Sequence, residues 1–213
     1  MNGVLYGLGD ASHLYTINVN NGVCTQVGSG TFSTSLSGIE FGFTAGSSAF
    51  YVSSDLGQNL SLTASGAATA GTSYASGLGL DTLAYNPLSS TFYGISASSH
   101  DIYTVNPLTG GATLAGSTGV SFLDTMGLSI STAGAGYFAG TIGGQTEFFG
   151  FNPSTLALTL LGDVGPAGDL PELNSITVAP TTVPEPGAIS LSAIGGALTL
   201  ILLRNRGKKT TKV

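Results

Sequence analysis

Four short polar residues recur at one position of a repeated pattern, directly after a leucine: Ser37, Asp81, Asp124 and Asn174. If the repeats form a closed ring, these equivalent positions converge at one end of its channel. Asp81 and Asp124 would then offer carboxylate oxygens, the ligands that Ca²⁺ prefers. Alternatively, each side chain accepts a hydrogen bond from a backbone amide where the chain enters a strand. We favour this second interpretation and predict no cofactor, with Ca²⁺ as the alternative; two close, unpaired carboxylates would raise the pKa of at least one.

Two histidines are the other candidates for chemistry. His13 and the pair His100-Asp101 fall in equivalent predicted loops of two repeats. Because Asp101 aligns with His13 and supplies no third ligand, we favour solvated loop residues over a metal site or an acid/base pair. The sequence contains no nucleophile elbow, P-loop, His-Glu-x-x-His or Cys-x-x-Cys motif. The single cysteine, Cys24, excludes an internal disulfide, and from these patterns we predict that the protein is not an enzyme.

Short strands separated by tight turns are the elements that must position these residues. The segments are apolar or alternate with a period of two, and Gly, Pro, Asn and Ser separate them. The clearest unit contains four such segments, at residues 80–87, 91–95, 102–110 and 112–116. Abundant glycine (33 residues), no tryptophan and 8 % charged residues fit strands and turns better than helices.

The units repeat along the chain. Their first strands begin at Leu36, Leu80, Leu123 and Leu173, which gives spacings of 44, 43 and 50 residues. Four strands in a period of about 40 to 50 residues indicate a β-propeller. The chain opens at the second strand of a unit, and residues 173–178 supply the missing first strand. We therefore predict an all-β fold in residues 1–180: a small propeller of about four four-stranded blades, closed by a C-terminal strand that joins the first blade.

The repeat pattern resembles that of the YncE-like and NHL-like surface propellers. The resemblance rests on strand and turn spacing, with no diagnostic motif. It implies the fold and does not indicate a ligand.

Charge is distributed very unevenly along the chain. All five Lys and Arg residues follow residue 203, whereas all eleven carboxylates precede it. A chain without cations before that point lacks the basic surface that nucleic-acid binding needs. It also lacks the side chains that usually hold phosphate or carboxylate substrates. We therefore predict no nucleic-acid partner.

The C-terminal region predicts a membrane segment. Residues 187–203 carry no charge, and as a helix they would extend about 26 Å, at the short end of what spans a bilayer. Every cation lies on one side of this run, which indicates that residues 204–213 form a cytoplasmic tail and argues against a buried core helix. Residues 181–186 form a proline-rich linker that separates the predicted transmembrane helix from the propeller.

This region also resembles a known family signal. The matching residues are Val183, Pro184, Glu185 and Pro186 before the apolar run, with Arg204 and Arg206 after it. Together they resemble the PEP-CTERM sorting signal of certain Gram-negative bacteria. The resemblance implies an exosortase-type processing enzyme as a partner, passage through the inner membrane and a final place at the cell surface or outside the cell. The alternative is a permanent single-pass anchor.

Residues 1–6 carry neither the basic region nor the long apolar run of an export signal. The sorting interpretation therefore expects sequence upstream of Met1. The blade count, the oligomeric state and cleavage of the C-terminal helix stay open at this level.

Two functions fit these observations. The first is a non-catalytic exported protein of the cell surface or extracellular matrix, presenting a propeller for adhesion or for contact with carbohydrate or protein. The alternative is a secreted propeller hydrolase or lyase that acts on extracellular polysaccharide. We favour the first, because a catalytic site would need converging titratable side chains, and residues 1–203 offer two histidines and no arginine.

Overall fold

A computed structural model describes residues 5–9, 12–18, 21–28, 41–46, 49–75, 78–164 and 176. The chain divides into two compact units, residues 1–178 and 179–213, and the second lies outside the described residues. Every regular element in the described ranges is a β-strand. The strands are β1 (Leu5–Gly9), β2 (His13–Ile17), β3 (Cys24–Gln26), β4 (Phe41–Ala45), β5 (Phe50–Ser54), β6 (Asn59–Leu62), β7 (Ala68–Ala70), β8 (Thr82–Asn86), β9 (Thr91–Ser96), β10 (Asp101–Asn106), β11 (Gly111–Ser117), β12 (Asp124–Ile130), β13 (Gly136–Ile142), β14 (Gln145–Phe151) and β15 (Leu158–Asp163).

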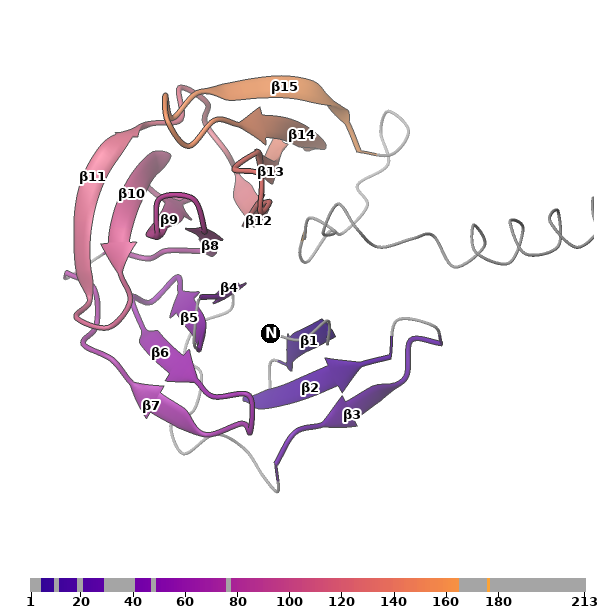
Figure 1. Ribbon diagram of the computed structural model, residues 1–213. Coiled ribbons are helices and arrows are strands. Elements are labelled where there is room, and N and C mark those ends of the chain that lie inside the picture. The colour runs from indigo at the N-terminus through magenta and orange to yellow at the C-terminus, as the bar shows by residue number, and fades with distance from the viewer. Residues whose placement is uncertain are drawn as a thin grey trace, which may run out of the picture. The chain divides into compact units, whose positions relative to one another are not determined.

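The strands form four antiparallel sheets, each a meander in which neighbours in sequence pair in space. We name them blade 1 (β1–β3), blade 2 (β4–β7), blade 3 (β8–β11) and blade 4 (β12–β15). Figure 1 shows the blades arranged around a common centre, with β4, β8 and β12 on the inside and β7, β11 and β15 on the outside. The predicted all-β propeller with four blades is therefore confirmed.

Asparagine followed by proline makes the same turn three times. The Oδ1 atoms of Asn86, Asn106 and Asn152 each accept a hydrogen bond from the backbone N–H two residues later, at 3.0, 3.0 and 2.9 Å. Such a turn replaces a backbone hydrogen bond with a side-chain one, and proline presets the φ angle that it needs. Local sequence therefore decides where each of these hairpins reverses.

Apolar clusters lie between neighbouring blades. Leu14 of blade 1 packs with Phe50 and Val52 of blade 2. A second cluster joins Tyr51 of blade 2 to Leu83 of blade 3. The largest contains side chains of blades 3 and 4: Ala84, Tyr93, Ile95, Ile102, Phe122, Leu128, Phe138, Phe149 and Phe151. Successive side chains of a strand point to opposite faces of its sheet, so a strand between two packed neighbours is buried on both faces. All five residues of β5 are buried in this way.

The inner strands β4 and β8 approach very closely at Gly42. A Cβ atom at this position would lie 2.6 Å from both Ser53 Oγ and the Thr82 carbonyl carbon. Because these atoms belong to both neighbouring blades, only glycine fits here without moving one of them.

Several sequence predictions fall outside the described residues. The first strand of blade 2 begins at Phe41, whereas the sequence predicts it from Leu36, and residues 29–40 are not described. Blade 1 has three described strands, and the predicted closing strand 173–178 lies outside the described residues except for the half-buried Ile176. The linker, the predicted helix 187–203 and the tail 204–213 also lie outside. Within the described ranges, no helix is long and apolar enough to cross a membrane.

Candidate functional site

Charged side chains gather at one end of the strands. We call the end at which β8 and β12 begin the acidic end, and the opposite end the charge-free end. The acidic end contains every described carboxylate, and both described histidines: Asp55, Asp81, Asp101, Asp124, Glu147, Asp163, His13 and His100. At the opposite strand ends and turns, the described residues include no Asp, Glu, His, Lys or Arg.

The repeat explains this segregation. Asp81 and Asp124 stand where the chain enters a first strand, and Asp55 and Asp101 stand beside the turn between a second and a third strand. In a four-stranded meander these two positions lie at the same end. The turns at the other end are built from Asn, Pro, Gly, Ser and Thr, which carry no charge.

Asp81 lies directly before β8 and is 7 % exposed. Its Oδ2 atom accepts a hydrogen bond of 2.5 Å from the backbone N–H of Ala97, in the turn after β9. The Asp81 N–H in turn donates to the carbonyl oxygen of Ile95 at 3.2 Å. The side chain therefore ties the start of one strand to the turn beyond the next, which is the structural role that the sequence favoured.

The pKa of Asp81 is raised above its ordinary value of 3.8. Burial is the main cause, since it disfavours the charged form. The Ala97 hydrogen bond opposes this effect, and the negative charges of Asp55 and, more weakly, Asp124 add to it. The negative charges of Asp55 in blade 2 and Asp124 in blade 4 thus act on the Asp81 carboxyl group of blade 3 across the acidic end.

Asp55 was not anticipated from the sequence. It follows β5 in the turn between second and third strands of blade 2. The sequence signal that could have found it is its position, because His100-Asp101 occupies the same turn of blade 3. The first-strand pattern used for Asp81 and Asp124 does not include this turn.

Asp124, the first residue of β12, is placed differently from Asp81. Its Oδ1 atom is buried and has no hydrogen-bond partner among the described residues, and neither has the Oγ1 atom of the adjacent Thr125, which is 6 % exposed. The Oδ1 atom of Asp124 therefore does not accept the predicted hydrogen bond from a backbone N–H among the described residues. Within the described ranges, no group of three or more His, Cys, Asp or Glu side chains is placed to hold a metal ion.

Neither histidine is the solvated loop residue that the sequence predicts. His100 is half-buried with a φ of 58°, and its Nδ1 accepts a hydrogen bond of 3.3 Å from the backbone N–H of Phe122. Its ring lies edge-on to the Phe122 ring at 5.9 Å. His13 is half-buried as well, and its Nδ1 has no partner among the described residues. The sequence could not show this because Phe122 lies 22 residues from His100.

The other predicted residues lie outside the described part of the chain. These are Ser37, Asn174 and the sorting-signal residues Val183, Pro184, Glu185, Pro186, Arg204 and Arg206.

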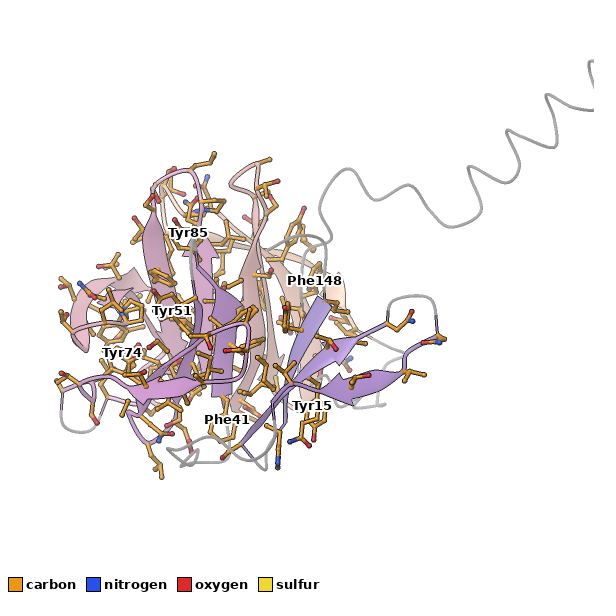
Figure 2. The ribbon with its side chains drawn as sticks, turned by 60° about the horizontal axis from the view of Figure 1, so that its bottom comes forward. Tyr15, Phe41, Tyr51, Tyr74, Tyr85 and Phe148 are labelled. Atoms are coloured by element: carbon orange, nitrogen blue, oxygen red, sulfur yellow. The ribbon has the colours of Figure 1, made fainter. Side chains whose placement is uncertain are left out.

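A cluster of aromatic rings at the charge-free end was also missed by the sequence analysis. Tyr85 of β8 and Phe92 of β9 face each other across their strand pair, and Phe92 also contacts Tyr51 of blade 2. Figure 2 shows Tyr85 among the turns at the upper end and Phe41, which begins β4 at the acidic end, near the lower end.

The four meanders define this protein as a β-propeller. The chain belongs to the family described as Domain of unknown function (DUF4394), whose model matches residues 1–174. No curated protein matches the chain.

Solved structures match the fold at low identity. A structural genomics protein of unknown function from Bacteroides thetaiotaomicron matches with a TM-score of 0.61 and 13 % identity, over 83 % of this chain and 52 % of that chain. A chain of the nidogen/laminin complex matches with a TM-score of 0.56 and 10 % identity, over 75 % and 61 %. A catalytically inactive virginiamycin B lyase from Staphylococcus aureus matches with a TM-score of 0.49 and 13 % identity, over 78 % and 54 %. The chain thus spans between about half and three fifths of these structures, and the likeness shows the fold alone.

Proposed function

We propose that this protein is exported and delivered to the cell surface or extracellular matrix by a PEP-CTERM sorting signal. There its propeller acts without catalysis, in adhesion or in contact with carbohydrate or protein. Its partners in delivery are the inner membrane and an exosortase-type enzyme, with the tail 204–213 left in the cytoplasm. The observation that carries the proposal is the separation of charge: every cation follows the apolar run, and every carboxylate precedes it.

The geometry of the acidic end supports a non-catalytic role. Asp81 is hydrogen-bonded to the Ala97 amide, and His100 to the Phe122 amide. Both side chains therefore serve backbone positions within the fold. A general acid or base would instead face a substrate within hydrogen-bond reach.

Delivery is tested with the full chain, tagged within the propeller and preceded by a secretion signal. It is expressed in a Gram-negative host with an exosortase and in the same host without it. We expect the protein at the surface with its C-terminal residues removed in the first host, and intact in the inner membrane in the second. Surface protease treatment and mass spectrometry of the C-terminus provide the readout.

The motif itself is tested by substituting Pro184, Glu185 and Pro186 together with alanine. This variant should stay in the inner membrane, whereas the matched variant Pro180→Ala should be delivered normally. Equal delivery of both variants in both hosts would refute sorting by this signal. Stable retention of the wild type in the membrane of the exosortase host would support the permanent anchor instead.

The enzymatic alternative gives a distinct result. A hydrolase or lyase would release new reducing ends or unsaturated sugars when the purified chain is incubated with extracellular polysaccharides. We expect no release, and a release that is lost in the Asp81→Asn variant would overturn the non-catalytic proposal.

We also propose that the acidic end needs no resident cation. Asp81 already uses one carboxylate oxygen for the Ala97 amide, so adding Ca²⁺ should leave the melting temperature unchanged. A ligand that binds only the folded state raises stability by RT ln(1 + L/Kd), where L is the free ligand concentration, so the effect grows with that concentration. A Ca²⁺-dependent rise that disappears in Asp124→Asn would establish the Ca²⁺ alternative.

A further inference from the structure

We propose that the seam between blades 2 and 3 at the charge-free end binds an uncharged polysaccharide, with Tyr85 and Phe92 as the rings on which sugar units stack. The inference rests on the proposed function and deepens it, because it chooses carbohydrate over protein as the partner and locates the contact.

The seam contains three rings in contact. Tyr85 and Phe92 are directly paired across β8 and β9, and their ring centroids lie 4.7 Å apart. Phe92 also lies edge-on to Tyr51 of blade 2, with 4.9 Å between centroids and an interplanar angle of 75°. Tyr51 is 7 % exposed, whereas Tyr85 and Phe92 are only half-buried. A buried ring thus supports two rings that keep part of their surface accessible.

Glycine at position 46 permits this arrangement. A Cβ atom at Gly46 would lie 2.6 Å from the Tyr51 ring and 3.0 Å from the Phe92 ring. The backbone of blade 2 therefore approaches both rings closely, and position 46 places no side chain over them.

The chemistry of the seam matches a sugar. Aromatic rings offer apolar area at little conformational cost, and tyrosine adds a polar group at its tip. The Tyr85 hydroxyl has no hydrogen-bond partner among the described residues, so it is able to bond a sugar hydroxyl. Sites for such ligands usually combine aromatic surface with a few polar groups.

The distribution of charge favours an uncharged polysaccharide over an anionic polysaccharide or a basic peptide. Residues 1–203 contain no Lys or Arg to pair with an anionic polysaccharide. The described carboxylates all lie at the acidic end, so a basic peptide would be drawn there. In the turn that follows Tyr85, the residues that reach the surface, such as Ser89 and Thr91, are uncharged.

Affinity gel electrophoresis of the full chain tests the seam, with dextran and hydroxyethyl cellulose as uncharged probes and alginate as the anionic comparator. We expect retardation by at least one uncharged polymer and none by alginate. Tyr85→Ala should weaken that binding by about tenfold, a typical loss for a central aromatic contact. Tyr85→Phe keeps the ring and should lose only a few-fold. The matched control is Tyr15→Ala, a half-buried tyrosine of β2 in blade 1, which should bind as the wild type does.

A second measurement avoids substitution altogether. Nitration of tyrosines, mapped by mass spectrometry, should be suppressed at Tyr85 when the retarding polymer is present and unchanged at Tyr15. This readout decides the matter if Tyr85→Ala unfolds, which its melting temperature would reveal.

The outcomes separate this inference from the proposed function. Binding that persists in Tyr85→Ala, with no protection of Tyr85, overturns the seam and leaves carbohydrate contact elsewhere. Absence of binding to any uncharged polymer, or binding to alginate alone, overturns the choice of ligand. Neither result bears on surface delivery, which the exosortase experiment decides independently.

Discussion

The side chains at the acidic end and at the charge-free end of the strands have different structural roles. At the acidic end, side chains hold the backbone together: Asp81 bonds the amide after β9, and His100 bonds the amide of Phe122. At the charge-free end, asparagine and proline form the turns, and the rings of Tyr85 and Phe92 stay partly accessible. One repeating unit thus produces an end whose polar side chains accept backbone hydrogen bonds and an end whose aromatic rings stay partly accessible.

The two ends also differ in the electrostatic cost of burying charged side chains. The described residues include no Lys or Arg, so no lysine or arginine side chain stabilises the charge of the described carboxylates at the acidic end. Burial of Asp81 next to Asp55 and Asp124 therefore favours its protonated form. No comparable electrostatic penalty exists at the charge-free end.

The largest effect that we predict comes from the close approach of blades 2 and 3. Gly42→Ala would place a Cβ atom 2.6 Å from Ser53 Oγ and the Thr82 carbonyl carbon, and it should lower the free energy of unfolding by about 2 to 3 kcal/mol. Chemical denaturation provides the measurement. Gly150→Ala is the matched control, because its nearest neighbours lie at 3.9 Å. Equal stability of the two variants would contradict the close contact.

Asp81→Asn tests the acidic end through pH. The pKa of Asp81 in the folded state lies above its ordinary value of 3.8. At pH values between 3.8 and this raised pKa, the folded state therefore binds more protons than the unfolded state. This residue therefore makes the protein more stable as pH falls through the raised pKa, and the gain is complete below 3.8. At neutral pH, Asp81→Asn should raise the free energy of unfolding by on the order of 1 kcal/mol. The variant should also lose the gain in stability that Asp81 gives as pH falls. Thermal melts of both proteins across pH check it, and a variant less stable than the wild type at neutral pH would refute it.

Two buried tyrosines differ in whether their hydroxyl groups have a hydrogen-bond partner. The Tyr93 O–H donates to the carbonyl oxygen of Pro153, in a turn at the charge-free end, at 3.1 Å. The Tyr74 hydroxyl, beside the acidic end, is buried without a partner among the described residues, and burial raises its pKa. Tyr93→Phe should cost about 1 kcal/mol of stability, whereas Tyr74→Phe should be neutral or slightly stabilising. The reverse order in denaturation experiments would contradict this assignment.

The smallest effects concern the neighbours of Asp81. Asp55→Asn and Asp124→Asn should both lower the pKa of Asp81, because each removes a nearby negative charge, and Asp55→Asn should lower it more. NMR titration of the Asp81 carboxyl group measures both shifts. A larger shift in Asp124→Asn would mean that blade 4 lies nearer to Asp81 than blade 2 does.

Much of the fold was predictable because its signals are local. The apolar alternation that predicts strands at 91–95 and 102–106 involves only a few consecutive residues, and so does the Asn106-Pro107 turn. The same repeat placed Asp81 and Asp124 at one end, where the charge of Asp124 contributes weakly to the raised pKa of Asp81. The effect of Asp55 on Asp81 and the ring contact of Phe92 with Tyr51 were not predictable, because each depends on how neighbouring blades face one another.

The amino-acid sequence alone determined the strands, the turns and the common end of Asp81 and Asp124. The period-two pattern and the turn residues that fix these features each act within one hairpin. Only the tertiary structure decided which side chains of different blades meet. Those contacts, such as Gly42 against Thr82 or Tyr51 against Phe92, depend on the packing and twist of whole sheets.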